Sequence, residues 1–271
     1  MGRLCPRKAR SLIMGGTVLA THALVACDGD NGDLTGPCCD AEASASFNFQ
    51  LDATGRVQFR LIGVNGRMLV TGVSAGEQFI VRGERRVESS SQADAEARLN
   101  DLQVDITETA NEIVVRTVQP TNTGGRNFTV DYELLVPERL VANITNVNGE
   151  ITVDDFDSGA FVTNVNGLVI VRDIEGDTAV SLVNGNIDAE LRIEDDGSID
   201  LVNVNGNIDL DIPVDTDAQL SATLANGTIT VINLVVQNQV SSPTSLTGTL
   251  GDGDGTIRLE STNGSITITG V

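Results

Sequence analysis

The sequence contains almost none of the residues on which common catalytic sites depend. Its 271 residues include one histidine, one tyrosine and no tryptophan. The only histidine, His22, and the only lysine, Lys8, both precede residue 27. The rest of the chain therefore cannot form a Ser-His-Asp or Cys-His site, a histidine-bound zinc, a Schiff-base lysine or a P-loop. With Tyr132 as the single large polar aromatic, the stacking platforms that usually hold sugar rings are missing too.

Positive charge is the second shortage. The formal net charge is −21, and residues 1–26 hold four basic and no acidic side chains, so the remainder stands at −25. Such a surface repels nucleic acid and anionic lipid headgroups. Acids are abundant, so a hydrolase that uses a carboxylate pair stays open as an alternative. Most of these acids, however, alternate with apolar residues and are expected on the wet face of strands. We expect no cofactor, no metal and no nucleic-acid partner.

The beginning of the chain has the features of a bacterial export signal. Basic residues from Arg3 to Arg10 precede an apolar stretch over 12–26, which is too short to span a bilayer. The stretch ends in Leu24-Val25-Ala26-Cys27, which resembles a lipobox. We therefore predict a lipoprotein signal peptide over 1–26 and an acylated Cys27 that anchors the mature chain in the cell envelope, in either the inner or the outer membrane. An ordinary secretory signal with a coincidental cysteine is the alternative.

Two regions of different composition follow. Residues 27–46 are rich in Asp, Gly, Ala and Ser, which predicts a flexible tether. The adjacent Cys38 and Cys39 lie in it, and their oxidation state stays open. Residues 47–140 are predicted to form an N-terminal β portion that closes the first rung of a later array. This portion contains one helix over 91–102, which begins at a Ser91 cap and is rich in alanine.

From residue 141 to 271 one short phrase returns: Asn-Gly, one further residue, an aliphatic residue and then alternation. Separations of 18, 18, 21, 21 and 37 residues divide its copies, and one earlier copy lies in the N-terminal portion. Recurrence at a nearly fixed period is typical of a stacked array. The predicted turn residues are Asn65, Gly66, Asn148, Gly149, Asn166, Gly167, Asn184, Gly185, Asn205, Gly206, Asn226, Gly227, Asn263 and Gly264.

Two all-β architectures satisfy this pattern. Asn and Gly tolerate positive φ, and alternating β-branched runs flank each pair, so the chain turns at Asn-Gly and runs as strand on either side. In a β-solenoid each rung lies on the one below, and the asparagines stack at equivalent corners. In an antiparallel meander or sandwich each Asn-Gly is a hairpin turn. The constant spacing favours the solenoid.

The end of the sequence predicts an open edge. The last strand, around Ile266-Thr267-Ile268, stops without an evident cap. Unprotected sheet edges invite pairing with another strand. We therefore expect edge docking to a partner or edge-mediated self-association.

Taken together, several features resemble a bacterial β-strand-repeat family of adhesin type. They are the early Val-Asn-Gly strand pair, the Ala/Glu-rich helix, the Arg-Asn-Phe-Thr-Val-Asp-Tyr-Glu segment before Val136-Pro137, the Asn-Gly ladder and the closing Asn-Gly-Ser-Ile phrase. The resemblance covers nearly all of the chain beyond the tether. It implies a repetitive all-β envelope domain of unknown function, with no catalytic residues to carry over.

These observations favour a lipid-anchored, non-enzymatic envelope protein that binds a polymer or a protein partner in the manner of an adhesin. An enzyme that acts on polysaccharide through carboxylates is one alternative, and it requires a groove with converging acids. An accessory protein of an envelope-stress response is another alternative, which neighbouring genes for a sensor kinase or sigma factor would favour.

Overall fold

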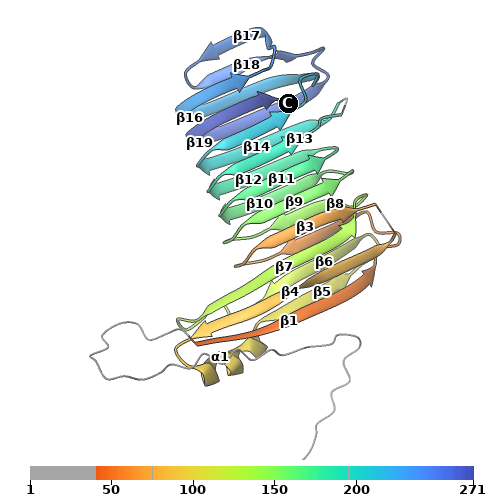
Figure 1. Cartoon of the computed structure of the whole chain (residues 1–271), viewed down its shortest axis with the longest axis vertical. Helices are drawn as coiled ribbons and strands as arrows, with labels where there is room; N and C mark the ends of the chain where they lie inside the picture. Colours follow the sequence, from red (N-terminus) through yellow and green to blue (C-terminus); the bar gives the residue numbers. More distant parts are fainter. Residues whose placement is uncertain (1–40, 75, 195) are drawn as a thin grey trace, which may run out of the picture.

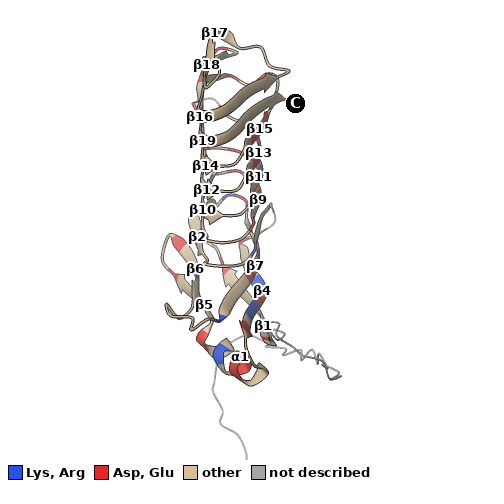
Figure 2. Cartoon of the chain, turned by 90° about the vertical axis from the view of Figure 1, so that its left-hand side faces the viewer, with Lys and Arg blue, Asp and Glu red and all other residues tan. Residues whose placement is uncertain are grey.

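The protein is a β-solenoid made of two facing sheets. The computed structural model describes residues 41–74, 76–194 and 196–271, so the predicted signal peptide, Cys27, Cys38 and Cys39 lie outside the described residues. Figure 1 shows the strands stacked along the long axis, with helix α1 at one end, the base, and strands β17 and β18 at the other end, the tip. Turned by 90°, the same body separates into two layers (Figure 2).

Each rung of the solenoid contributes one strand to the first sheet and one to the second. The described residues form eight such rungs, and neighbouring rungs pair in parallel. From base to tip they are β6 (Glu112–Val118) with β7 (Asn127–Pro137), β2 (Gln58–Ile62) with β3 (Met68–Val73), β8 (Val141–Thr145) with β9 (Ile151–Phe156), β10 (Ala160–Asn166) with β11 (Val169–Ile174), β12 (Thr178–Asn184) with β13 (Ile187–Leu191), β14 (Ser198–Asn205) with β15 (Ile208–Ile212), and the long strands β19 (Gly255–Gly270) and β16 (Ala218–Ile232), which run through both sheets.

The predicted solenoid is confirmed, and the alternative of an antiparallel meander is wrong. Successive copies of the phrase pair in parallel with equivalent residues opposite each other, as Asn166 with Asn184 and Asn184 with Asn205 show. A hairpin at Asn-Gly would instead pair the two strands that flank it with each other. The Asn-Gly pairs are corners at which the chain passes from the first sheet to the second.

The order of the rungs differs from the order of the sequence at both ends. The pair β2 and β3 lies between β6/β7 and β8/β9, so the N-terminal portion supplies two rungs of the array and residue 140 does not separate two bodies. At the other end, β19 lies between β14/β15 and β16. The prediction that the last strand of the sequence forms an open edge is therefore wrong, because β19 has a parallel neighbour on each side.

Antiparallel strands cover the base. In the first sheet β5 (Gln103–Glu108) pairs with β6, and in the second sheet β4 (Gln78–Ser89) pairs with β7 while β1 (Ala41–Asp52) pairs with β4. The predicted tether over 27–46 was too long, because residues 41–46 already belong to β1. Ala43 and Ala45 point inward there beside Phe47, and the small Ala and Ser side chains of this stretch gave it the composition of a linker.

The helix forms close to its predicted place. Helix α1 (Gln92–Arg98) begins at the Ser91 cap, whose hydroxyl accepts a hydrogen bond of 3.3 Å from the Asp94 amide. The turn η1 (Leu99–Asp101) continues it as a 3-10 helix. Leu102, which ends the predicted span, is buried. The helix contacts β1 and β4 at the base.

The tip is covered on one sheet only. Strand β18 (Ser245–Leu250) pairs in antiparallel fashion with residues 218–223 of β16, and β17 (Gln237–Ser242) pairs with β18. Both additions belong to the first sheet. In the described part of the chain, no strand pairs with the outer side of β16 beyond its Asn-Gly corner.

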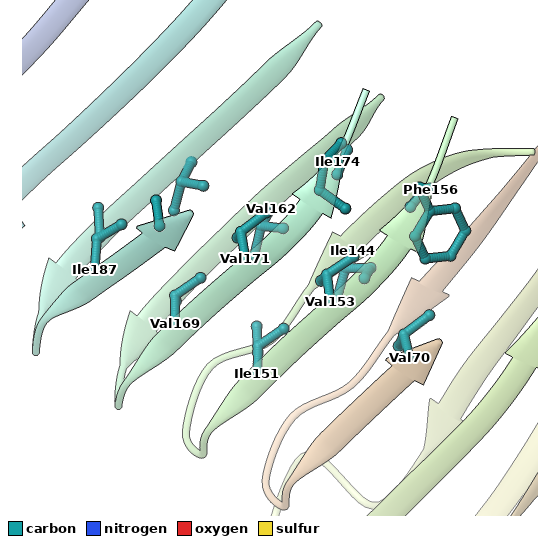
Figure 3. Close-up of a cluster of buried hydrophobic side chains, with 14 of the residues drawn as sticks. Val70, Ile144, Ile151, Val153, Phe156, Val162, Val169, Val171, Ile174 and Ile187 are labelled. Atoms are coloured by element: carbon teal, nitrogen blue, oxygen red, sulfur yellow. The ribbon is translucent and has the colours of Figure 1, made fainter. Parts of the chain in front are cut away.

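A continuous apolar core fills the space between the sheets. Figure 3 shows aliphatic side chains from neighbouring rungs in register, such as Ile151, Val169 and Ile187, which line up along the solenoid axis. Burying a side chain of this size contributes about 1.5–3 kcal/mol. Phenylalanines gather toward the base, where the Phe59 ring lies 5.4 Å from that of Phe79. The alternation of apolar and polar residues therefore builds one dry interior.

Candidate functional site

The seven Asn-Gly corners stack into one column that runs along the solenoid. The asparagine side chains form a ladder in which each Nδ2 donates to the Oδ1 of the next asparagine toward the base, at 2.7–2.9 Å. From base to tip the ladder consists of Asn65, Asn148, Asn166, Asn184, Asn205, Asn263 and Asn226. At the base the Asn65 amide ends the ladder by donating to the Phe128 carbonyl at 3.0 Å. The ladder holds adjacent rungs in register.

A second set of asparagines closes the corners from inside. Asn146, Asn164 and Asn203 are buried, and each lies two residues before an asparagine of the ladder. Their Nδ2 groups donate to carbonyls of Gly66, Gly149 and Gly185 respectively, at 2.8–3.1 Å. These bonds give a donor to carbonyls of the part-buried corners.

A stripe of valines lies beside the ladder. The residue before the corner asparagine is valine in five of the seven rungs, and parallel pairing places these valines one above another. This valine stripe consists of Val64, Val147, Val165, Val183 and Val204. Three of its members, Val147, Val183 and Val204, are 37–40% exposed. Rungs of a sheet are about 4.8 Å apart, so the stripe is a narrow apolar band with a regular repeat.

An acidic corner, which was not predicted, lies on the second-sheet strands β9 and β11, at their ends away from the Asn-Gly corners. Oxygens of Asp154, Asp155 and Asp173 all lie within 4.8 Å of one another, which is close enough to hold a metal ion. Asp155 and Asp173 both have positive φ, 63° and 47°. They lie one rung apart, because Arg172 pairs with Asp154 and Ile174 with Phe156. Exposed carboxylates of a strongly acidic chain crowd in this way without a ligand, and nothing else among the described residues at this corner points to one.

An open hollow of about 630 Å³ adjoins the acidic corner. Five acids line it, together with residues 71–74 and Arg192: Glu138, Asp155, Asp157, Asp173 and Glu175. Loss of hydration raises the pKa of the Glu138 carboxyl, and the neighbouring Asp157 and Asp155 raise it further. Loss of hydration likewise raises the pKa of Asp154, with Asp155 and Asp173 adding to the effect and Arg172 opposing it. The corner is therefore a place where like charges repel.

Comparison with known protein families assigns most of the chain to one family. Residues 83–269 match the Toastrack DUF4097 family, a domain of unknown function. The chain belongs to the Toastrack DUF4097 family. A search among curated proteins found no match.

Several solved structures are similar to this Toastrack protein at low sequence identity. A "putative cell adhesion protein" from Clostridium sporogenes is 11% identical with a TM-score of 0.47, over 83% of this chain and 99% of that one. A "putative adhesin" from Bacteroides fragilis is 13% identical with a TM-score of 0.29, over 83% and 97% of the two chains. A "putative lipid binding protein" from Parabacteroides distasonis is 11% identical with a TM-score of 0.25, over 83% and 96%.

The Toastrack fold brings all the predicted turn residues together at one corner. It leaves the predicted lipidation site, Cys27, outside the described residues. Within those residues, no helix has the length and apolar character needed to cross a membrane. The valine stripe and the acidic corner were missed, although a signal for both was present: Val165 and Val183 are 18 residues apart, as are Asp155 and Asp173, which is the rung period.

The acidic corner of this Toastrack protein predicts a stability gain on neutralisation. Because the pKa values of Glu138 and Asp154 are raised, both groups bind protons more readily in the folded chain, so stability falls as pH rises from the ordinary carboxyl pKa through the raised one. We expect Asp155→Asn to raise the melting temperature by a few degrees at neutral pH and by less at pH about 4, where the neighbouring acids begin to protonate.

The control for this prediction is Asp196→Asn. Asp196 has φ 62°, which matches the 63° of Asp155, so both variants gain equally from the tolerance of asparagine for this conformation. Thermal unfolding followed by circular dichroism at both pH values measures the difference. Equal shifts for the two variants, or a gain for Asp155→Asn that grows on acidification, would contradict repulsion at this corner.

Proposed function

We propose that this Toastrack protein is a non-catalytic, lipid-anchored binding protein of the bacterial cell envelope. The observation that carries the binding function is the valine stripe: apolar side chains stand exposed at a regular spacing beside a ladder whose amides bind each other. Exposed apolar surface arranged in a contiguous band is typical of an interaction site. A repeating surface suits a repeating ligand, so we propose an extended envelope polymer as the ligand and rank a folded protein partner second.

The absence of common catalytic groups supports a non-catalytic role. Beyond residue 26 the chain has no histidine and no lysine. The polar groups nearest the stripe are the ladder amides, which donate to one another. This surface offers contact area and periodicity to a ligand.

The binding experiment is co-sedimentation with purified, insoluble envelope polymer. The mature chain, residues 27–271, is compared with a triple variant, Val147→Ser, Val183→Ser and Val204→Ser. Each change removes about 1 kcal/mol of apolar contact, so we expect binding to weaken at least about tenfold. The matched control is Val57→Ser, Val118→Ser and Val271→Ser, which alters three exposed valines outside the stripe.

Two results would contradict the binding proposal. One is equal binding by the stripe variant and the native chain, and the other is no binding of the native chain to any envelope polymer. Recovery of a single protein from envelope extracts, lost in the stripe variant, would replace the polymer with a protein partner.

The proposed anchor is tested separately. The lipobox places Cys27 14 residues before the first residue of β1, which lies at the base. We expect Cys27→Ser to move the protein from the membrane fraction of the producing bacterium to the soluble fraction, and to abolish incorporation of labelled fatty acid. Retention of the label in this variant would show that Cys27 is not the acylated residue.

A glycan hydrolase is the second candidate function. The hollow places Glu138, whose pKa is raised, among other carboxylates, and acid hydrolysis of glycosides uses one protonated and one ionised carboxyl. Screening the mature chain on envelope and matrix glycans tests it. Product formation that Glu138→Gln abolishes would favour the enzyme, and no product from any of them would eliminate this candidate.

A further inference from the structure

The tip of the solenoid ends in a step. The first sheet continues beyond β16 through β18 and β17, whereas the second sheet ends at the far half of β16, residues 226–232. Figure 2 shows β17 and β18 standing above β16 in one layer. The outer backbone of β16 in the second sheet is therefore an edge, and among the described strands none covers it.

The strands around this step carry no charged side chain, and the nearest acids in the sequence, Asp217 and Asp252, lie just beyond the ends of β16 and β18. Residues 218–250, which include β16, β17 and β18, hold no Asp, Glu, Lys or Arg, although the chain beyond residue 26 carries a net charge of −25. Ile232, Val235 and Val240 are 47%, 82% and 71% exposed. Natural edge strands are usually guarded by charged side chains, by proline or by a covering segment. The edge of β16 has no guard of the first two kinds.

We propose that two copies of this protein associate tip to tip, with the edge of β16 in each copy paired to β17 of the other. A second copy is the occupant that the charges favour, because the tip is the neutral region of an otherwise strongly negative surface, and two like-charged bodies repel least there. The step selects the arrangement. If the first sheets faced each other, the two β17–β18 hairpins would meet at β17 and hold the two second sheets apart, so neither step would be filled.

When the first sheet of each copy faces the second sheet of the other, each hairpin fills the step of its partner. A twofold axis parallel to the strands produces this arrangement and closes the pair as a dimer. The two halves of β16 run in opposite directions around the corner, and β17 runs parallel to the first half, since both are antiparallel to β18. Strand β17 of one copy therefore meets the edge of the other in antiparallel orientation, with Val240 and Ile232 at the contact.

The contact is small, so the dimer is weak. Each of its two strand pairs involves about six residues, and interfaces of this size lie at the low end of protein association. A bulge in β17 between Gln237 and Val240 weakens edge pairing further. We expect a monomer–dimer equilibrium at micromolar to millimolar concentrations. With the anchor proposed above, the two membrane ends would lie at opposite ends of the dimer, so the copies would sit on facing membranes.

Sedimentation velocity of the mature chain tests the proposal in solution, without membrane or polymer. Reducing buffer excludes disulfides through Cys27, Cys38 and Cys39. We expect Ile232→Lys and Val240→Glu each to be monomeric at every concentration, and an equimolar mixture of the two to dimerise, because one of its strand pairs then joins Lys to Glu and the other is native. Thr152→Lys is the control, since Thr152 lies on an interior strand of the same sheet, and it should dimerise like the native chain.

Four outcomes would overturn the proposal. They are a native chain that stays monomeric at millimolar concentration, a dimer unaffected by Ile232→Lys, a mixture that does not restore association, and growth into species larger than a dimer. Circular dichroism of each variant confirms that it is folded. A failed polymer-binding experiment leaves this result unchanged, because the two sites lie on different parts of the solenoid.

Discussion

Replacing Gly185 by alanine is expected to lower the free energy of unfolding by at least about 3 kcal/mol. Gly185 has φ 137°, a conformation that residues with a Cβ rarely adopt. A Cβ built there would lie 1.9 Å from the Gly167 carbonyl oxygen of the neighbouring rung. All three nearest atoms belong to the Gly167 backbone of the neighbouring rung, so the clash can be relieved only by separating the two rungs and straining the asparagine ladder. Urea unfolding followed by circular dichroism measures the loss.

Gly55→Ala is the control for a glycine with positive φ in open space. Gly55 also has positive φ, 75°, but a Cβ built there would meet no atom within 4 Å. It should cost only the backbone strain, about 1 kcal/mol. Equal costs for the two substitutions would contradict the prediction, because neither the φ of Gly185 nor its contact with Gly167 would then add to the cost.

Removal of residues 254–271 is expected to unfold the whole tip. Strand β19 is the parallel partner of both halves of β16, and it also joins β16 to β14 and β15. Without it β16, β17 and β18 lose their attachment to the array. The edges of β14 and β15 are then unpaired, and the apolar core between these two strands is exposed. We expect rapid proteolysis between residues 213 and 253 and strong aggregation, both measurable on the purified chain.

The control removes the same number of residues from the other side of β16. Deleting residues 234–251 and joining the ends with a short Gly-Ser linker takes away β17 and β18, which lie at the end of the first sheet. This variant keeps the β16–β19 pair and should stay folded and resistant to protease up to residue 233. A truncated chain as stable as this control would mean that β19 does not hold the tip.

The local structure of a rung could be predicted from the sequence, because the same residue pattern recurs in each rung. Asn-Gly marks each corner, and alternation assigns each strand a buried and an exposed face. The stacking order could not be predicted, because rungs with identical local patterns fit on one another equally well. The interval of 37 residues between Asn226 and Asn263 suggested two ordinary periods. It holds instead a hairpin, followed by a strand that inserts on the other side of β16.

The acidic corner and the start of β1 could not be predicted for different physical reasons. The acidic corner depends on which acids share a level, and it becomes visible only when Asp155 is aligned with Asp173 on the rung period. The alternating pattern predicts only that most acids lie on the exposed face of strands, and it does not group them. The alanine and serine of residues 41–46 are typical of linkers and predict a tether, but these residues belong to β1, where Ala43 and Ala45 are buried.

Strand β19 lies between β14/β15 and β16, which all precede it in the sequence, so assembly of the tip depends on this later strand. During synthesis or export β16 emerges before β19, yet its place in the stack is reached only across β19. Strands β16, β17 and β18 therefore cannot join the stack until residues 255–270 have been synthesised and have paired with β14 and β15. Contacts between segments that are far apart in the sequence slow folding. The same arrangement exposes truncated chains to degradation, because a chain that ends before β19 has unpaired strands that proteases can cleave.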